Sequence, residues 1–321
     1  MKRIGVLTSG GDAPGMNACI RAVVRRGISL GLEVWGIKRG YRGLINGEMT
    51  PLNRRDVGGV IQKGGTFLQT ARCPEFKDPK GVREGLRRLN EMGIEGLVVI
   101  GGDGSMRGAY ALCQEGFPVV GVPASIDNDV WGTDIAIGVD TALNTVLVAL
   151  DRIKDTASSH GRAFLIEVMG RNCGYLALMS GLAGGAEAVL IPEEEISLEQ
   201  VAQIVEEAYK KGKPHAIIVI AEGAIHKTSE VAAYLERDEV GFEVRTTILG
   251  HIQRGGSPTA FDRLLASRLG VAAVEALAQG KSGVMMGLKG NKIEAVPLEE
   301  VIRSTRTLDP KLLEMALVLS Q

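Results

Sequence analysis

The chain has few cysteines, no excess of either charge sign and no long apolar run. Its four cysteines, at positions 19, 73, 113 and 173 of 321 residues, have neither the spacing of a metal site nor the density of a disulfide scaffold. The 37 Lys and Arg residues are balanced by 38 Asp and Glu residues, which argues against a dedicated nucleic-acid-binding protein. No apolar segment approaches the roughly 18 residues that span a bilayer, and no signal-peptide pattern follows Met1. We therefore predict a cytoplasmic protein without nucleic-acid or membrane partners.

Glycine, by contrast, is plentiful (43 residues), and much of it follows apolar runs rather than forming a low-complexity tract. The clearest case is the apolar run 97–100, which ends in the sequence Gly-Gly-Asp-Gly-Ser at 101–105. Glycines in such a turn allow consecutive backbone N–H groups to face an anion, and Asp103 adds a carboxylate for a divalent cation. A magnesium-bound nucleotide needs both features, although a purely structural strand-to-helix turn fits the same residues.

Apolar strands alternate with amphipathic helices along the chain. Residues 40–43 are expected to form a loop, and residues 50–65 a polar connection. The alternation predicts an α/β fold with parallel sheets flanked by helices, in two units joined by a long helix at 140–160. Ligands of such sheets bind where the loops converge, at the carboxyl ends of the strands. We expect strands at 3–8, 32–37, 97–100, 119–122, 164–168, 216–221 and 244–249, and helices at 16–30, 79–92, 106–115, 140–160, 174–183, 198–211 and 259–279.

The loops of the first half combine phosphate-binding amides with one arginine and several carboxylates. Asp103 suits a metal ion, and the planar guanidinium of Arg72 suits bridging phosphate oxygens. Asp127 and Asp129 flank Asn128, and either carboxylate can accept the proton of an attacking hydroxyl, although an Asx-rich structural turn gives the same triplet. Together these loops predict phosphoryl transfer. The set is Gly11, Arg72, Asp103, Gly104, Ser105, Ser125, Asp127 and Asp129.

The loops of the second half are rich in arginine and contain one carboxylate, Glu222. Arginine binds phosphate through two parallel hydrogen bonds, while a glutamate accepts hydrogen bonds from sugar hydroxyls. This composition predicts a site for a phosphorylated, hydroxylated small molecule, although Arg162 and Arg245 taken singly resemble surface residues. The set is Arg162, Arg171, Glu222, Arg245, His251 and Arg254.

Seven segments resemble, in the same order along the chain, those of the bacterial-type ATP-dependent 6-phosphofructokinase family. They are residues 7–17 (LTSGGDAPGMN), 70–76 (TARCPEF), 100–105 (IGGDGS), 126–129 (IDND), 169–171 (MGR), 221–223 (AEG) and 250–258 (GHIQRGGSP). That family transfers the γ-phosphoryl group of MgATP to the 1-hydroxyl of fructose 6-phosphate in glycolysis. The resemblance therefore implies two Rossmann-like, three-layer α/β/α domains with mostly parallel sheets. One is an ATP-binding domain of residues 1–138 plus 255–303, and the other a fructose 6-phosphate-binding domain of residues 139–254 plus 304–321.

The resemblance also implies roles for individual residues. Asp127 corresponds to the general base, Arg72, Ser125 and Arg171 to further catalytic residues, and Asp103 to the ligand of Mg²⁺. Family members are homotetramers in which the equivalents of Arg162 and Arg245 reach the sugar phosphate from a neighbouring subunit. The implied ATP-binding residues are Gly11, Tyr41, Arg72, Cys73, Gly102, Asp103, Gly104 and Ser105. The implied sugar-binding residues are Ser125, Ile126, Asp127, Arg162, Met169, Gly170, Arg171, Glu222, Arg245, His251, Ile252, Gln253 and Arg254.

An effector site is implied as well, since the family binds ADP or phosphoenolpyruvate between subunits. Lys154 and Lys211 stand where arginine is frequent in the family, and lysine cannot make the bidentate contacts of a guanidinium. We therefore expect an effector site of altered preference or strength. Its residues are Arg21, Arg25, Arg54, Lys154, Gly185, Glu187, Lys211, Lys213 and His215.

Other phosphate-binding proteins share parts of this pattern. Pyrophosphate-dependent phosphofructokinases resemble the chain most, but they typically carry Asp and Lys at the equivalents of Gly104 and Ala124, where side chains crowd the α-phosphate of ATP. Lipid and nicotinamide-nucleotide kinases share only the Gly-Gly-Asp-Gly turn. A non-catalytic nucleotide or sugar-phosphate sensor on the same fold is a further alternative, against which the intact set of Asp103, Asp127 and Arg171 argues. Gly104 and Ala124 favour ATP as the phosphoryl donor.

Overall fold

The chain divides into two compact units in the computed structural model, which describes residues 1–237 and 240–320. Unit 1 comprises Met1–Thr141 and Arg254–Arg306, and unit 2 comprises Ala142–Gln253 and Thr307–Gln321. The chain therefore passes between the units three times, each time a few residues from an expected domain boundary. Both units are α/β with mostly parallel sheets, which confirms the expected fold class.

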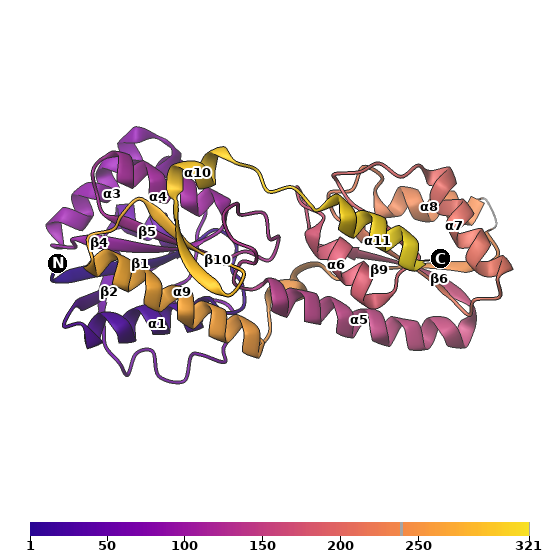
Figure 1. The fold of residues 1–321 in the computed structure, drawn as a ribbon, viewed down its shortest axis with the longest axis horizontal. Coiled ribbons are helices and arrows are strands. Elements are labelled where there is room, and N and C mark those ends of the chain that lie inside the picture. Colours follow the sequence, from indigo (N-terminus) through magenta and orange to yellow (C-terminus); the bar gives the residue numbers. More distant parts are fainter. Residues whose placement is uncertain (238–239, 321) are drawn as a thin grey trace. The chain divides into compact units, whose positions relative to one another are not determined.

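Unit 1 is built on a seven-stranded sheet (Figure 1). Its strands are β1 (Arg3–Ser9), β2 (Glu33–Ile37), β3 (Met49–Leu52), β4 (Gly96–Gly101), β5 (Val119–Pro123), β10 (Val284–Lys289) and β11 (Lys292–Pro297). The order across the sheet is β11-β10-β5-β4-β1-β2-β3, and only the outermost pairs, β2–β3 and β10–β11, are antiparallel. The central strands β1, β4 and β5 are buried almost throughout, and for that reason their sequences are nearly continuous apolar runs.

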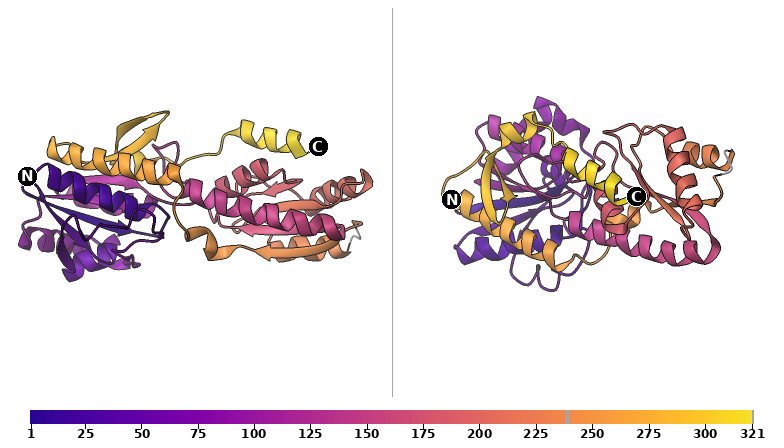
Figure 2. Two further views of the ribbon diagram at one scale, coloured as in Figure 1. Left: turned by 90° about the horizontal axis from the view of Figure 1, so that it is seen from below. Right: turned by 45° about the vertical axis from the view of Figure 1, so that its right-hand side comes forward.

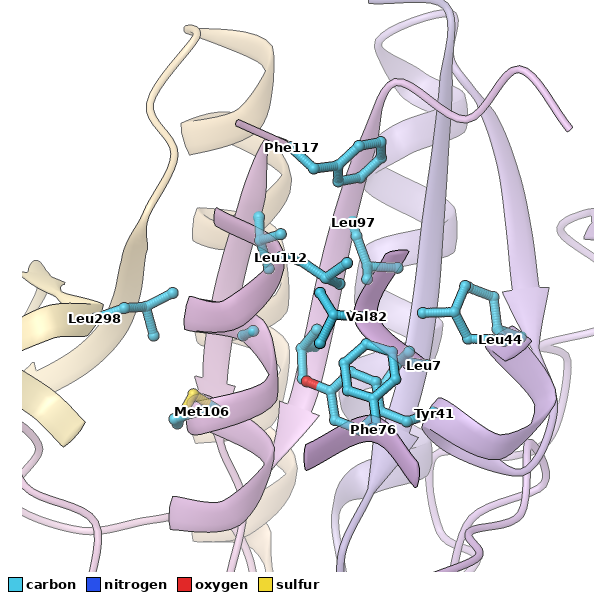
Figure 3. Packing of buried hydrophobic residues seen from close by; sticks show 14 of the residues in the cluster. Leu7, Tyr41, Leu44, Phe76, Val82, Leu97, Met106, Leu112, Phe117 and Leu298 are labelled. Atoms are coloured by element: carbon cyan, nitrogen blue, oxygen red, sulfur yellow. The ribbon is translucent and has the colours of Figure 1, made fainter. Parts of the chain in front are cut away.

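Helices cover both faces of this sheet and give three layers. They are α1 (Met16–Ser29), α2 (Gly40–Asn46), α3 (Pro79–Glu91), α4 (Asp103–Gln114), α9 (Ala260–Ala278) and α10 (Leu298–Arg303), with the 3₁₀ turn η1 (Pro74–Lys77). Helices α1 and α9 lie side by side on one face (Figure 2), whereas α3, α4 and α10 cover the other. Buried side chains such as Leu97, Met106, Leu112 and Leu298 fill the space between α4, α10 and the sheet (Figure 3).

Residues 40–43 form the start of α2, so the expected loop is wrong. Glycine disfavours helices in isolation, but both glycines of this stretch are required by close packing. A Cβ on Gly43 would overlap the carbonyl of Lys38, and one on Gly40 would lie 2.7 Å from the carbonyl oxygen of Thr8. Tertiary packing therefore overrides the local helix propensity here.

Unit 2 is built on a four-stranded, fully parallel sheet in the order β7-β8-β6-β9. Its strands are β6 (Arg162–Val168), β7 (Ala188–Leu190), β8 (Ala216–Ala221) and β9 (Glu243–Ile248), and its helices are α6 (Tyr175–Gly184), α7 (Leu198–Lys210), α8 (Thr228–Arg237) and α11 (Pro310–Ser320). The long helix α5 (Val139–His160) starts in unit 1 and continues into unit 2, and the 3₁₀ turn η2 (Gly250–Arg254) follows β9. Helices α7 and α8 pack on one face of the sheet, and α6 packs on the other, where Gly181 lies against Val189. Among the described residues, no helix combines the length and the apolar character needed to cross a membrane.

Candidate active site

Three loops of unit 1 meet at the carboxyl edge of its sheet. The ends of β1, β4 and β5 are neighbours, because Ser9 faces Gly101 and Gly101 faces Pro123 in the sheet register. The structure therefore brings together the predicted phosphate-binding and catalytic loops at the edge where parallel sheets bind ligands. These loops carry Gly11, Gly102, Asp103, Gly104, Ser105, Ser125, Ile126, Asp127 and Asp129.

The turn after β4 leads directly into α4, whose first residue is Asp103. Gly101 is required in this turn, since a Cβ there would overlap the Ser9 carbonyl and the Ser105 hydroxyl. The N-terminus of a helix attracts anions through its N–H groups and its dipole. Ser105 is buried, and its Oγ has no hydrogen-bond partner among the described residues. The turn thus offers positive potential to a phosphate, with a buried hydroxyl, unpaired in the described part of the chain, directly behind it.

Tyr41 supports this turn from within the core. Its ring is stacked on that of Phe76, with centroids 4.1 Å apart, and only 5% of the residue is exposed (Figure 3). Its hydroxyl donates to the Ser105 carbonyl at 2.6 Å. Burial raises the pKa of the Tyr41 phenol well above its usual value, so the hydroxyl remains a donor. The Tyr41 side chain therefore supports the turn after β4, and the nucleotide contact expected of this residue stays a prediction.

Arg72 and Cys73 immediately precede η1. Arg72 is exposed, whereas Cys73 is partly buried and packs against the core of unit 1. Burial raises the pKa of the Cys73 thiol, which disfavours the thiolate form. The guanidinium of Arg72 therefore faces solvent, whereas Cys73 contributes packing contacts with the core.

The loop after β5 takes its shape from Asn128. The backbone of Asn128 has a φ of 53°, in the left-handed region that asparagine tolerates better than most residues. Its buried side chain donates from Nδ2 to the Asp134 carbonyl (3.3 Å) and accepts at Oδ1 from the Ala136 N–H (3.0 Å). Asp127 and Asp129, both partly exposed, are thereby held on either side of an anchored residue.

Ser125 links the two acidic residues of this loop. Its Oγ accepts from the Asp127 N–H (3.2 Å) and donates to Asp129 Oδ1 (3.3 Å). Burial raises the pKa of the Asp129 carboxyl, and the negative charge of Asp103 raises it further. Asp103 and Asp129 therefore form an acidic centre that a cation would stabilise. Ile126 is fully buried, and the substrate contact expected of this residue stays a prediction.

This acidic centre fits a magnesium ion bound together with a nucleotide. Mg²⁺ prefers oxygen ligands, keeps several waters and needs only one or two carboxylates when phosphates supply the remaining contacts. Across the described ranges, no group of three or more His, Cys, Asp or Glu side chains makes a self-contained metal site. Asp103 also accepts from Arg107 Nε (2.8 Å) one turn along α4, which fixes the direction of its carboxylate.

Three loops of unit 2 meet at the carboxyl edge of its own sheet in the same way. Val168 faces Ala221 and Glu167 faces Ile248 in the register, so the loops after β6, β8 and β9 begin side by side. The Arg171 side chain is 80% exposed, and its Nε lies 3.9 Å from Glu222 Oε1. A cation beside a carboxylate suits an anionic, hydroxylated ligand. The predicted sugar-phosphate residues at this edge are Met169, Gly170, Arg171, Glu222, His251 and Ile252.

Gln253 has a structural part in this second loop cluster. Its side chain is fully buried, accepts from the Met169 N–H at 3.1 Å and donates to the Gly250 carbonyl at 2.9 Å. It thereby joins the loops after β6 and β9. The substrate contact expected of Gln253 stays a prediction; what the structure shows is the amide joining these two loops.

Arg162 and Arg245 lie away from this edge. Arg162 is the first residue of β6, opposite Glu243 at the start of β9, and Arg245 follows two residues later. Both guanidiniums contact the Glu243 carboxylate, Arg162 at 2.6 Å. At about 3.3 Å per strand residue, Arg162 lies roughly 20 Å from the end of β6. Arg162 therefore does not join Arg171 within the same chain, and the guanidinium of Arg245, about 10 Å from the end of β9, is held at Glu243.

Arg254 lies in unit 1 beside Gly11, although its sequence motif groups it with the sugar-phosphate residues. Its Nη1 donates to the Asp12 carbonyl at 3.3 Å, and a Cβ on Gly11 would come within 2.6 Å of the same atom. A guanidinium beside the β1 turn adds positive charge to the edge where Asp103 and the α4 N-terminus lie. The structure thus places Arg254 with the predicted nucleotide residues.

Residues 3–277 match the family described as Phosphofructokinase. The chain belongs to this family. It is 56% identical, over 321 residues and the full length of both chains, to the ATP-dependent 6-phosphofructokinase of Thermotoga neapolitana. It is 55% identical, over an equally complete alignment, to ATP-dependent 6-phosphofructokinase 1 of Thermus thermophilus.

Solved phosphofructokinase structures share the fold. The Pichia pastoris phosphofructokinase in the T-state matches with a TM-score of 0.91 at 39% identity, covering 99% of this chain and 37% of that one. The phosphofructokinase of Saccharomyces cerevisiae matches with a TM-score of 0.89 at 37% identity, covering 100% of this chain and 48% of that one. The chain thus spans less than half the length of these yeast chains. A pyrophosphate-dependent phosphofructokinase from Nitrosospira multiformis, at 19% identity and a TM-score of 0.89, covers 99% of this chain and 91% of that one and has the same fold.

The residues predicted to form a phosphofructokinase effector site fall into two groups. In unit 2, Lys154 donates to the Gly184 carbonyl, and Glu187 is paired with Lys213 at 3.3 Å. Burial lowers the pKa of the His215 imidazole, with the charges of Lys154 and Lys213 adding to that effect and Glu187 opposing it. A basic cluster around one buried carboxylate therefore forms in this unit. Its members are Lys154, Gly185, Glu187, Lys213 and His215. Lys211 is the C-cap residue of α7 in the same unit, and Arg21, Arg25 and Arg54 lie in unit 1.

Some residues that shape this phosphofructokinase site are absent from the predicted set. Asn128 is visible in the sequence between two aspartates, but its anchoring role depends on Asp134 and Ala136. Arg306 donates to the same loop although it lies 172 residues further along the chain, and the sequence around it gives no indication of this contact. Interactions of this range become visible only in the folded chain.

Proposed function

We propose that this chain is an ATP-dependent 6-phosphofructokinase. It transfers the γ-phosphoryl group of ATP to the 1-hydroxyl of D-fructose 6-phosphate and releases fructose 1,6-bisphosphate and ADP. The observation that carries the proposal is the 56% identity, over the full length of both chains, to a relative of that name. The loop cluster of unit 1 suits nucleotide phosphates, and that of unit 2 suits a sugar phosphate. As a glycolytic enzyme the protein would act in the cytoplasm.

In unit 1, the first turn of α4 and the Gly11 turn bind the phosphates of ATP, and Arg72 adds a bidentate contact. Asp103 and Asp129 would hold Mg²⁺, which neutralises phosphate charge when bound. Asp127 accepts the proton of the attacking 1-hydroxyl. Ser125 supports both acidic residues, because its Oγ contacts the Asp127 N–H and the Asp129 carboxylate.

In unit 2, the exposed guanidinium of Arg171 and the carboxylate of Glu222 bind the phosphorylated sugar, supported by Met169, Gly170, His251 and Ile252. Arg162 starts β6 roughly 20 Å from this edge, and Arg245, the third residue of β9, lies about 10 Å from the end of its strand. We therefore propose a homotetramer in which these two arginines serve the sugar phosphate of a neighbouring subunit. Light scattering of the purified protein measures that assembly directly.

A coupled assay with fructose 6-phosphate and either ATP or pyrophosphate tests the proposed reaction. We expect turnover with ATP and Mg²⁺ and none with pyrophosphate. Turnover with pyrophosphate alone would refute ATP as the donor. Absence of turnover with both donors would favour a non-catalytic sensor of nucleotides or sugar phosphates.

Gly104 is the residue through which donor choice can be changed. A Cβ at this exposed position meets no atom within 4 Å, so a side chain fits without disturbing the fold. We expect Gly104→Asp to raise the KM for ATP by about 10-fold or more, because it places a negative charge beside the nucleotide phosphates. Gly104→Ala serves as the control and should change KM much less. Steady-state kinetics with both donors measures the effect, and an unchanged ATP KM in Gly104→Asp would contradict this role.

We also propose ADP and phosphoenolpyruvate as effectors, acting weakly at the basic cluster. Lys154 donates to the Gly184 carbonyl, and lysine there lacks the paired donors with which arginine binds phosphate. We expect either effector to shift the half-saturation concentration of fructose 6-phosphate by about 5-fold or less, which is at the low end of the coupling usually found between effector and substrate sites. Lys154→Arg should enlarge that shift. Effector titration at several sugar concentrations measures it, and no response to either ligand would rule out the site.

A further inference from the structure

The Asp127–Asp129 turn depends on one carbonyl oxygen, that of Asp134. Asn128, at the centre of the turn, donates to this oxygen from Nδ2 at 3.3 Å, and the Ala136 N–H donates to Asn128 Oδ1 at 3.0 Å. The Asn128 side chain is fully buried and its backbone is left-handed. A shift of the Asp134 carbonyl therefore moves Asn128, which is the covalent neighbour of both acidic residues.

Arg306 donates to the same carbonyl oxygen. Its Nη2 lies 2.6 Å from the Asp134 oxygen, and its Nη1 lies 2.6 Å from the Thr133 oxygen. Two donors on one planar guanidinium fix both the position and the orientation of two successive peptide groups. Arg306 and Asn128 thus donate to the same oxygen atom. The Asp134 carbonyl is the link between the guanidinium and the turn that carries Asp127.

The same loop has an independent attachment to the β10–β11 hairpin. Thr133 Oγ1 accepts from the Leu288 N–H at 3.0 Å, and the Asp134 N–H donates to the Leu288 carbonyl at 2.8 Å. The Asp134 carboxylate accepts from the Gly290 N–H at 2.6 Å. The loop therefore remains attached to the sheet without Arg306. What Arg306 adds is the orientation of the two carbonyls and a positive charge near Asp129, not the fold of unit 1.

Arg306 is the last residue of unit 1 before the chain passes into unit 2. We propose that it is a positioning residue for phosphoryl transfer, which sets the geometry of the Asp127–Asp129 turn through the Asp134 carbonyl and Asn128. This inference rests on the proposed function, in which Asp127 is the general base. Arg303, the last residue of α10, offers a contrast, because its side chain is 73% exposed and pairs along its own helix with Glu299.

Arg306→Gln and Arg306→Lys test this inference, with Arg303→Gln as the matched control. We expect Arg306→Gln to lower kcat about 10- to 100-fold, since misplacing a reacting group by about 1 Å can cost 10²-fold. The KM values for ATP and fructose 6-phosphate should change less than about 3-fold, because ground-state contacts are untouched. Arg306→Lys should recover only part of the lost kcat. Lysine restores the positive charge, but its ammonium cannot donate to both carbonyls in the planar geometry of a guanidinium. Arg303→Gln should keep the wild-type kcat and unfolding midpoint.

Chemical rescue distinguishes a positioning role of Arg306 from a general loss of structural stability in the variant. In Arg306→Ala, guanidinium ions added at a low, non-denaturing concentration can occupy the space beside the two carbonyls. We therefore expect the kcat of Arg306→Ala to rise with the guanidinium concentration. The kcat of Arg303→Ala should not rise. A wild-type kcat in Arg306→Gln would overturn the inference, as would a lost kcat with a lowered unfolding midpoint and no rescue. The wild type is assayed first. If it is inactive with ATP, the proposed function itself fails, whereas an active wild type with an indifferent Arg306 contradicts only this inference.

Discussion

An Asp127→Ser variant is expected to lose turnover by roughly 10²- to 10⁴-fold, the usual contribution of a general base. A serine hydroxyl is a far weaker base than a carboxylate, so the proton of the attacking 1-hydroxyl loses its acceptor. Binding of fructose 6-phosphate depends mainly on other residues, and its affinity should change only a few-fold. Coupled kinetics gives kcat, and calorimetric titration gives the sugar affinity.

The turn itself should survive this substitution. Its shape is set by the Asn128 side chain, and the Asp127 contact to Ser125 is made by the backbone N–H. We therefore expect an unchanged unfolding midpoint. Asp151→Ser, on an exposed position of α5, is the matched control and should keep full turnover. Retained turnover in Asp127→Ser would exclude Asp127 as the base and direct the same test to Asp129.

The strands that lead into the site were predictable because their physical causes are local. A parallel strand buried on both faces has to be apolar along its whole length, as β4 is. A turn that approaches both neighbouring backbone and a ligand has to be glycine, as at Gly101, where a Cβ would overlap the Ser9 carbonyl. Both requirements leave a mark in the sequence itself.

Other features depend on partners far along the chain and leave no such mark. Arg254 sits in a motif that suggests sugar phosphate, yet its guanidinium meets the Asp12 carbonyl across 242 residues. Gln253 and Tyr41 stay predicted ligand contacts, but the sequence gives no sign that both side chains are buried and hydrogen-bonded to neighbouring loops. The strands of the β10–β11 hairpin, Val284–Lys289 and Lys292–Pro297, likewise lie outside the strands expected from the sequence.

Asp262, in the first turn of α9, joins the starts of two helices. Its buried carboxylate accepts from the N–H groups of Gly138 (2.9 Å) and Thr141 (2.8 Å) and from the Thr141 hydroxyl (2.5 Å). It therefore satisfies donors at the start of α5. In return, the Thr259 hydroxyl at the N-cap of α9 donates to Asp140 Oδ2 (2.5 Å). The two helix starts cap one another at the point where the chain leaves unit 1.

An Asp262→Ala variant should lose roughly 3–5 kcal/mol of unfolding free energy, since it leaves several buried donors unpaired at about 1–3 kcal/mol each. Glu275→Ala on the same helix is the matched control. Glu275 pairs with Arg26 near the surface, where an ion pair is worth about 1 kcal/mol or less. Urea denaturation of wild type and both variants measures the losses. Equal, small losses in the two variants would contradict the reciprocal caps.

The pH dependence of the unfolding free energy shows how much the negative charge of Asp262 contributes, because Asp262→Asn keeps the shape of the side chain without the charge. Burial raises the pKa of the Asp262 carboxyl above its ordinary value of 3.8, although hydrogen bonds from Thr141 and Gly138 oppose the rise. The folded chain therefore binds this proton more tightly than the unfolded chain, and the contribution of Asp262 to the wild-type unfolding free energy falls as the pH rises from about 3.8 through the raised pKa. Asp262→Asn lacks this component. The stability difference between wild type and Asp262→Asn should therefore shrink as the pH rises through that window, as urea denaturation at several pH values would measure. A difference that grows with pH would mean that the caps outweigh the cost of burying the charge.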